Sequence, residues 1–60
     1  MRSLVKALDE LKEKDLNLIE LRFFENRPFK EVADILGITE SNAKMRTYRA
    51  LNKLKKLMTD

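Results

Sequence analysis

The sequence predicts an all-α domain, a four-helix orthogonal bundle that contains a helix-turn-helix. Apolar residues recur at helical spacing along the chain, and no stretch alternates with a period of two for long enough to form a strand. Turn signals at three places divide the chain into four helices with short connections. Sixty residues, 43% hydrophobic and 38% charged, suit one soluble domain over residues 1–60, near the lower size limit for unaided folding.

Residues 3–25 predict two helices. The first follows Ser3, which we expect to cap it, and carries one apolar stripe: Leu4, Val5, Leu8 and Leu11. The apolar pattern changes phase around residues 12–15. We therefore expect Asp15 to be the N-cap of a second helix, from Leu16 to about Glu25.

A third, short helix is expected after the turn at residues 26–28. Asn26 fits the left-handed position that ends a helix, and Pro28 fits the first turn of the next one, where its missing N–H costs nothing. The apolar face of this helix consists of Phe29, Val32, Ala33 and Leu36. Gly37 should end it, because glycine accepts the positive φ of a tight turn.

The last helix is predicted from about Glu40 to Met58. Ile38 should be buried before it, Thr39 should cap it, and Glu40 lies at the positive end of its dipole. Its inner face is expected to consist of Ala43, Thr47, Ala50, Leu51, Leu54 and Met58.

Residues 28–58 have the pattern of a helix-turn-helix. Two helices that cross closely need a small residue at the crossing, and Ala33 lies four residues before the turn glycine, Gly37. Ala43, also small, fits the inner face of the second helix. An ordinary αα-hairpin with glycine in its turn is the alternative.

The amino-acid composition excludes several kinds of catalytic and metal-binding site. The chain has no cysteine and no histidine, which excludes disulfides, thiolate or imidazole metal sites and histidine-based catalysis. One glycine is too few for a glycine-rich phosphate loop, and no apolar run is long enough to cross a bilayer or to form a signal peptide. We therefore expect a binding module, not an enzyme, with no cofactor and no membrane partner.

The positive charge is concentrated in the last helix. Residues 1–27 carry six basic and six acidic groups, whereas residues 41–59 carry six basic groups and no acid. A basic stripe confined to one segment is typical of a surface that binds a polyanion, and a solvated helix face is the alternative.

The outward face of this helix carries side chains suited to a DNA major groove. Lysine donates to guanine, asparagine pairs with adenine, and methionine or tyrosine packs on a thymine methyl. The DNA-binding candidates are Lys30, Ser41, Asn42, Lys44, Met45, Arg46, Tyr48 and Arg49, with Asn52 on the same face. Arg46, Arg49 and Lys30 suit phosphates. Tyr48 has the alternative of a half-buried core ring, and Lys53, Lys55 and Lys56 are expected to be a solvated helix end.

Three segments, residues 11–15, 19–25 and 31–38, resemble region 4 of sigma-70 family RNA polymerase sigma factors, most closely the extracytoplasmic-function type. The similarity continues through Lys44, Arg46, Arg49, Ala50 and Leu54, which match the Lys-x-Arg-x-x-Arg-Ala pattern of that family. The resemblance covers nearly the whole chain.

The resemblance implies a bacterial, cytoplasmic and nucleoid-associated transcription-initiation domain. Its recognition helix would bind the −35 promoter element, with Lys44, Met45, Tyr48 and Arg49 at bases or flanking phosphates, and its N-terminal helices would bind the polymerase β-subunit flap. An anti-sigma factor is a further possible partner. The chain departs from the family at Lys12, Pro28, Ala43, Thr47, Met45 and the pair Ser41-Asn42, so the base preference is not transferable.

The second helix is apolar nearly all round. Leu16, Ile19 and Phe23 cluster on one side, Leu18 and Leu21 lie roughly opposite, and Phe24 lies between them. One group should stay exposed and form a docking surface for the flap or an anti-sigma helix, with weak self-association of the isolated domain. The candidates are Leu16, Leu18 and Leu21. The alternatives are that neighbouring helices cover this helix completely, that the chain is the helix-turn-helix of a response-regulator-type transcription factor, or that it is a protein-interaction bundle.

Overall fold

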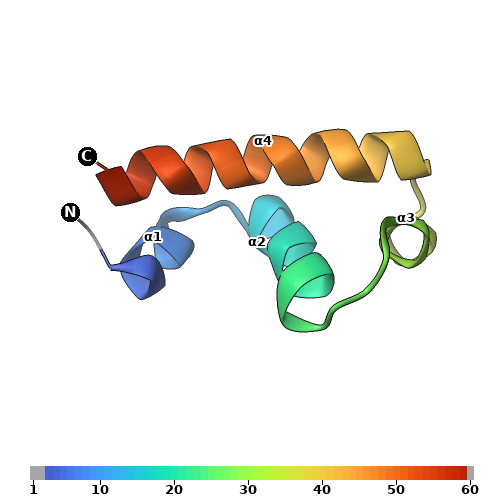
Figure 1. Ribbon diagram of the computed structural model, residues 1–60, viewed down its shortest axis with the longest axis horizontal. Coiled ribbons are helices and arrows are strands. Elements are labelled where there is room, and N and C mark those ends of the chain that lie inside the picture. The colour runs from blue at the N-terminus through green and yellow to red at the C-terminus, as the bar shows by residue number, and fades with distance from the viewer. Residues whose placement is uncertain (1–2, 60) are drawn as a thin grey trace.

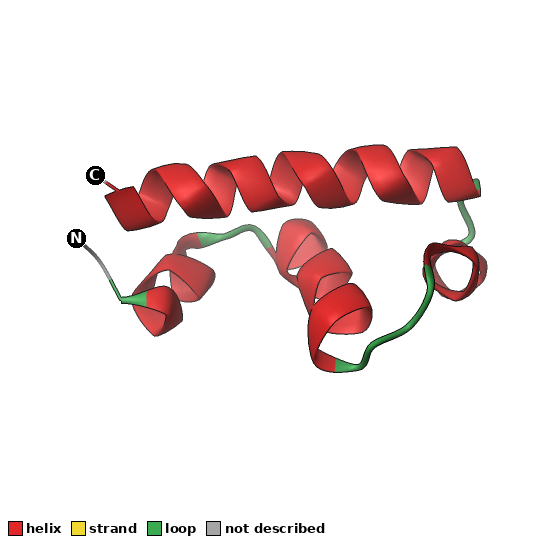
Figure 2. Ribbon diagram, viewed as in Figure 1, coloured by secondary structure: helices red, strands yellow, loops and turns green. Residues whose placement is uncertain are grey.

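The computed structural model describes residues 3–59, which form helices joined by short turns (Figure 1). The elements are α1 (Leu4–Glu10), α2 (Glu13–Ile19), the π-helical turn η1 (Glu20–Phe24) that continues α2, α3 (Phe29–Leu36) and α4 (Glu40–Thr59). Figure 2 shows only helices and loops within this described part of the chain. The predicted all-α class is therefore confirmed.

Helix α4 runs along the whole length of the molecule, whose principal extents are 34 × 18 × 16 Å. Helices α1 and α2 lie along one side of α4, and α3 lies near its N-terminal end (Figure 1). Because α3 is seen end-on while α4 lies across the view, the two helices of the helix-turn-helix cross at a steep angle, as the predicted orthogonal bundle requires. None of the helices over residues 3–59 is long and apolar enough to cross a membrane.

The start of α1 agrees with the sequence, and the start of α2 does not. The Ser3 hydroxyl accepts a hydrogen bond from the Lys6 amide at 3.3 Å and caps α1. Asp15 as N-cap is wrong, because α2 begins at Glu13 with Lys12 in the N-cap position. The Asp15 carboxylate accepts a hydrogen bond from Lys53 Nζ at 3.1 Å instead, so it ties α2 to α4.

The second helix ends in a widened turn. The Glu25 amide donates to the Glu20 carbonyl at 2.9 Å, an i to i−5 bond, and the Arg27 amide donates to Leu21 at 3.0 Å. Asn26 has φ 55°, which confirms the left-handed position predicted for it. The π turn itself was not predicted.

Pro28 is the N-cap of α3, one residue before the position predicted for it. Its carbonyl accepts hydrogen bonds from the Glu31 and Val32 amides, both at 3.0 Å. Arg27 joins the two sides of this turn, because its guanidinium binds Glu25 at 2.8 Å and also binds Glu31. These hydrogen bonds raise the pKa of Arg27 above its usual value.

The turn between α3 and α4 has the predicted chemistry. Gly37 ends α3 with φ 69°, and the Ile38 amide donates back to Ala33 at 3.0 Å. The Thr39 hydroxyl accepts from the Asn42 amide at 3.1 Å and caps α4. Ile38 is half-buried and packs against the core.

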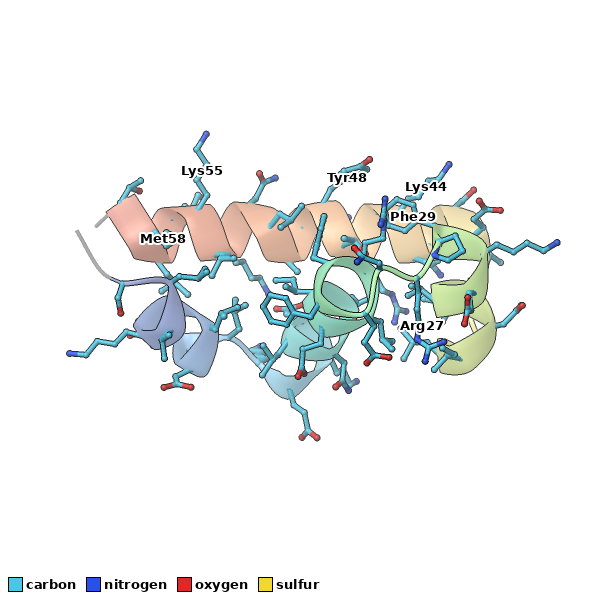
Figure 3. The ribbon with its side chains drawn as sticks, turned by 60° about the horizontal axis from the view of Figure 1, so that its bottom comes forward. Arg27, Phe29, Lys44, Tyr48, Lys55 and Met58 are labelled. Carbon is cyan, nitrogen blue, oxygen red and sulfur yellow. The ribbon has the colours of Figure 1, made fainter. Side chains whose placement is uncertain are left out.

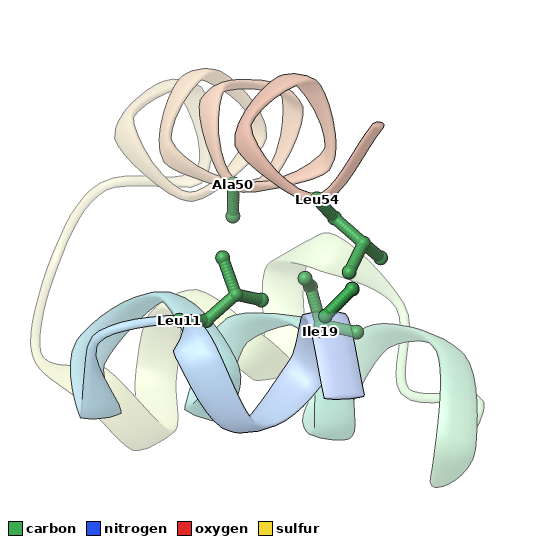
Figure 4. Close-up of a cluster of buried hydrophobic side chains, with 5 residues drawn as sticks. Leu11, Ile19, Ala50 and Leu54 are labelled. Atoms are coloured by element: carbon green, nitrogen blue, oxygen red, sulfur yellow. The ribbon is translucent and has the colours of Figure 1, made fainter. Parts of the chain in front are cut away.

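Two clusters of buried side chains lie beneath α4. The first joins α1, α2 and α4, with Leu11 and Ile19 below Ala50 and Leu54 (Figure 4), and also includes Ala7. The second joins α2, α3 and α4 through Leu18, Val32, Ala33 and Ala43. Thr47 is fully buried, and its hydroxyl donates to the Ala43 carbonyl at 2.7 Å.

The inner face of α4 is largely as predicted, and that of α1 is not. Within α4, Ala43, Thr47, Ala50 and Leu54 are buried, while Leu51 and Met58 are half-buried against the first cluster. In α1 the buried residue is Ala7, whereas Leu4 and Val5 are 46% and 70% exposed. Ala7, Leu8 and Leu11 form the stripe of α1 that packs in the first cluster with α4. The first turn of α1 lies outside this packing contact.

Candidate nucleic-acid interface

The outward surface of α4 is held rigidly by its buried side. Four buried residues (Ala43, Thr47, Ala50 and Leu54) set the rotation of the helix about its axis, and the Thr39 cap sets where it begins. Six of the eight predicted DNA-binding residues of the chain are therefore exposed on this helix: Ser41, Lys44, Met45, Arg46, Tyr48 and Arg49. Asn42 is half-buried at the N-terminus of α4, and Lys30 is exposed on α3.

Lys44 and Tyr48 form one edge of this surface, beside α3. Figure 3 shows both side chains pointing away from the body of the protein on the same side of α4 as Lys55, with Phe29 next to Lys44. The Tyr48 side chain is 57% exposed. The alternative that Tyr48 is a core ring is therefore wrong, and its ring is accessible to a ligand.

Arg46 and Arg49 form the opposite edge, which borders a basic groove of about 490 Å³. Lys14, Asp15 and Asn17 of α2 line the groove from one helix, and Arg46, Arg49 and Lys53 of α4 line it from the other. Leu18 and Leu36 complete the lining. The groove thus has four cationic side chains against one carboxylate, and that carboxylate already pairs with Lys53. An excess of positive charge in a concave surface suits a phosphate group.

The groove contains residues that sequence reasoning missed. Lys14 and Asn17 are far from α4 in sequence, and only the packing of α2 against α4 brings them next to Arg46 and Arg49. Lys53, predicted to be a solvated helix end, is 56% exposed but paired with Asp15. Lys55 and Lys56 are exposed, as predicted.

The predicted partner residues are placed differently from the expectation. Leu18 is only 3% exposed, so it cannot contact a partner while the domain is folded, and that prediction is corrected. Leu16 and Leu21 are half-buried against the first and second clusters. The apolar side chains that the second helix leaves exposed are Phe23 and Phe24, at 43% and 59%, because they lie in the π turn beyond the contact with α4.

The exposed surface of α4 carries groups that suit binding. Among residues 3–59, no group of three His, Cys, Asp or Glu side chains is placed to hold a metal ion. What the structure offers instead is a row of hydrogen-bond donors, a thioether and an aromatic ring on one helix, with cations on both edges. This combination matches what base edges and flanking phosphates require.

Comparison with known proteins agrees with this geometry. Residues 7–56 match the family model described as "Sigma-70, region 4". The chain is 41% identical over 54 residues to the RNA polymerase sigma factor SigV of Bacillus subtilis (strain 168), which covers 90% of this chain and 32% of that protein. The chain therefore spans about a third of the curated relative that it matches. No solved structure matches significantly. Because the family model covers residues 7–56, the chain belongs to the sigma-70 region 4 family.

Proposed function

We propose that this chain binds the −35 element of promoter DNA, with α4 in the major groove, as the region 4 module of a bacterial sigma factor. The observation that carries the proposal is the exposed surface of α4, which has six basic residues and no acidic residue over 41–59 and is held by a capped helix-turn-helix. Membership of the sigma-70 region 4 family, a family of DNA-binding regulatory domains, supports it over a response-regulator-type helix-turn-helix and over an enzyme.

The side chains divide into two groups by the chemistry they offer. Lys44, Met45, Tyr48 and Arg49 project from the outer side of α4, where they would meet base edges. Lys14 and Arg46 face each other across the groove and Lys30 lies on α3, where all three would meet phosphates. Phosphate contacts would orient the helix, and base contacts would set its sequence preference.

Removing a side chain that contacts a base should weaken DNA binding more than removing a remote charge. We expect Lys44→Ala and Arg49→Ala each to weaken binding to the preferred duplex by about 1–3 kcal/mol, the range for a bidentate base contact. Lys55→Ala is the matched control, because Lys55 lies on the same side of α4 as Lys44 but about three turns further along. Fluorescence anisotropy with a labelled duplex measures all three. If Lys55→Ala has the largest effect, the assignment of the base-reading residues is wrong.

The same module should also contact the core polymerase. We propose that Phe23 and Phe24 form the docking surface for the β-subunit flap, since they are large exposed apolar side chains on an α2–η1 helix otherwise packed into the core. The similarity to a sigma factor of RNA polymerase supports a polymerase partner. An anti-sigma factor, or a second copy of the chain in weak self-association, would compete for the same surface.

A charge placed on this surface should separate polymerase binding from DNA binding. We expect Phe24→Asp to weaken binding to the isolated flap at least tenfold, because the carboxylate would have to be buried against an apolar partner, and to change DNA affinity by no more than about twofold. Val5→Asp is the control, since Val5 is 70% exposed on α1. Flap binding can be followed by calorimetry. Unchanged flap binding by a folded Phe24→Asp variant would place the partner surface elsewhere.

A further inference from the structure

An aromatic side chain of α3 lies at the centre of a cluster that reaches the DNA-facing surface. The ring of Phe29 is 6.2 Å from the ring of Tyr48, centre to centre, with the planes tilted by 56°. The guanidinium carbon of Arg22 lies 4.9 Å from the centre of the Phe29 ring, and Lys44 Nζ lies 5.9 Å from it. Phe29 therefore connects η1 to two residues of the recognition helix α4.

Tyr48 depends on Phe29 for its position. Its side chain is 57% exposed, so few neighbours restrict it, and the tilted contact with Phe29 is the ring contact that the described residues give it. Tilted pairs at this separation are favourable for two aromatic rings. Without the Phe29 ring, the Tyr48 side chain would be free to occupy other rotamers on the surface of α4.

Arg22 holds the Phe29 ring in turn. Its guanidinium lies over the rings of Phe29 and Phe23, the latter at 5.5 Å, and its Nε is buried without a hydrogen-bond partner among the described residues. No ion pair within the described part of the chain involves Arg22. A cation over a ring face is attracted more strongly when it is desolvated, so the two rings stabilise this partly buried guanidinium.

The π turn provides the geometry for this contact. Arg22 and Phe23 both lie within η1, where the Glu25 amide bonds to Glu20 rather than to the residue four before it. The wider turn changes the direction in which these side chains leave the helix, compared with a continued α-helix. Single π turns inside α-helices are frequent at functional sites.

We infer that Phe29 is a positioning residue for DNA recognition: held by Arg22, it fixes the Tyr48 ring at the edge of α4 that faces DNA, so the base preference at the step facing Tyr48 depends on Phe29. In this role Phe29 acts through Tyr48 and need not touch DNA itself. The inference rests on the proposed function for its consequence in DNA binding. The placement of Tyr48 by Phe29 is a property of the free protein and can be measured without DNA.

The first arm of the test uses the free 60-residue chain. Tyr48 is the only tyrosine and the chain has no tryptophan, so the tyrosine band of the near-UV circular dichroism spectrum and the NMR signals of the tyrosine report on this one side chain, while the three phenylalanines absorb at shorter wavelength. Phe29→Leu should move the Tyr48 Hα–Hβ coupling constants, which do not depend on the ring current of Phe29, toward the averaged values of a mobile side chain, and should reduce the tyrosine near-UV band. Phe24→Leu is the matched control, because Phe24 is 59% exposed and makes no ring contact among the described residues. Equal Tyr48 signals in the two variants would overturn the inference.

The second arm measures base discrimination. The probes are a duplex selected by the wild-type chain from a randomised pool and duplexes with single base-pair changes. Discrimination is the dissociation constant of a changed duplex divided by that of the selected duplex. Phe29→Leu should reduce this ratio about three- to tenfold at the position that Tyr48→Ala also affects, and should have no further effect in a Tyr48→Ala background. If the wild-type chain binds no duplex, the proposed function is wrong; if it binds and Phe29→Leu keeps its discrimination, only the positioning role is wrong.

A second variant protects the test against misfolding of Phe29→Leu. Arg22→Gln leaves both rings in place and removes the cation over Phe29, so it should shift the Tyr48 signals in the same direction by a smaller amount. It should leave the salt dependence of DNA binding unchanged, because Arg22 acts here through Phe29. Loss of about one unit of salt slope would show that Arg22 binds a phosphate itself, and would overturn its assignment as the residue that holds Phe29.

Discussion

Replacing Ala33 by Leu should lower the free energy of unfolding by about 1–3 kcal/mol, the usual cost of an overpacked core position. Ala33 is 4% exposed and lies in the second cluster with Val32 and with Ala43, which is fully buried. Both helices of the helix-turn-helix thus present a methyl group where α3 meets α4, and three added carbons have no space there. A domain of sixty residues has few kcal/mol to lose, so partial unfolding at room temperature is the expected outcome.

Asp34→Leu is the matched control for this prediction. It introduces the same residue, leucine, one position along α3, where the side chain is exposed. It should change the free energy of unfolding by no more than about 0.5 kcal/mol. Urea unfolding followed by far-UV circular dichroism compares the two variants with the wild-type chain. Equal urea midpoints for Ala33→Leu and wild type would mean that α3 and α4 are not packed closely at this residue.

The features that sequence reasoning predicted correctly are local ones. Ser3, Asn26, Gly37 and Thr39 each end or begin a helix by chemistry confined to three or four neighbouring residues, and all four are confirmed. Asp15 has the same capping chemistry, but a cation 38 positions later in the sequence pairs with it. Such a competition between a local and a distant partner cannot be read from one sequence. The π turn is likewise a result of how η1 packs, since its residues suit an α-helix equally well.

The two binding surfaces differ, for a related reason, in how well the sequence predicts their exposed residues. The recognition helix has small or apolar residues on one side and polar residues on the other, so its phase, and with it the exposure of Lys44, Tyr48 and Arg49, follows from the sequence. The α2–η1 helix has apolar residues on all sides, so its sequence does not predict which side faces the core. Which of its residues are exposed is decided by the packing of α4, which buries Leu18 and leaves Phe24 outside.

Salt should weaken DNA binding more than any single substitution. The cations placed to meet phosphates are Lys14, Lys30 and Arg46, and Arg49, which also borders the groove, can reach a phosphate next to the base that it contacts. With about four phosphate contacts, the slope of log affinity against log salt should be roughly −4, so raising monovalent salt from about 50 to about 200 mM should weaken binding about 100- to 250-fold. Lys53 is not counted, because its charge is already paired with Asp15.

This steep salt dependence has a functional consequence that can be tested with charge-removing variants. Lys14→Gln should reduce the slope by about one unit, whereas Lys55→Gln should leave it unchanged, because Lys55 lies beyond Arg46 and Arg49 along α4 and does not line the groove. The isolated chain should then bind DNA only weakly at physiological salt, and tethering to polymerase would supply the effective concentration that it lacks. Filter binding over a salt series measures the slope. A slope near zero would instead support an apolar protein-interaction bundle, and nanomolar binding by the isolated chain at physiological salt would make tethering unnecessary.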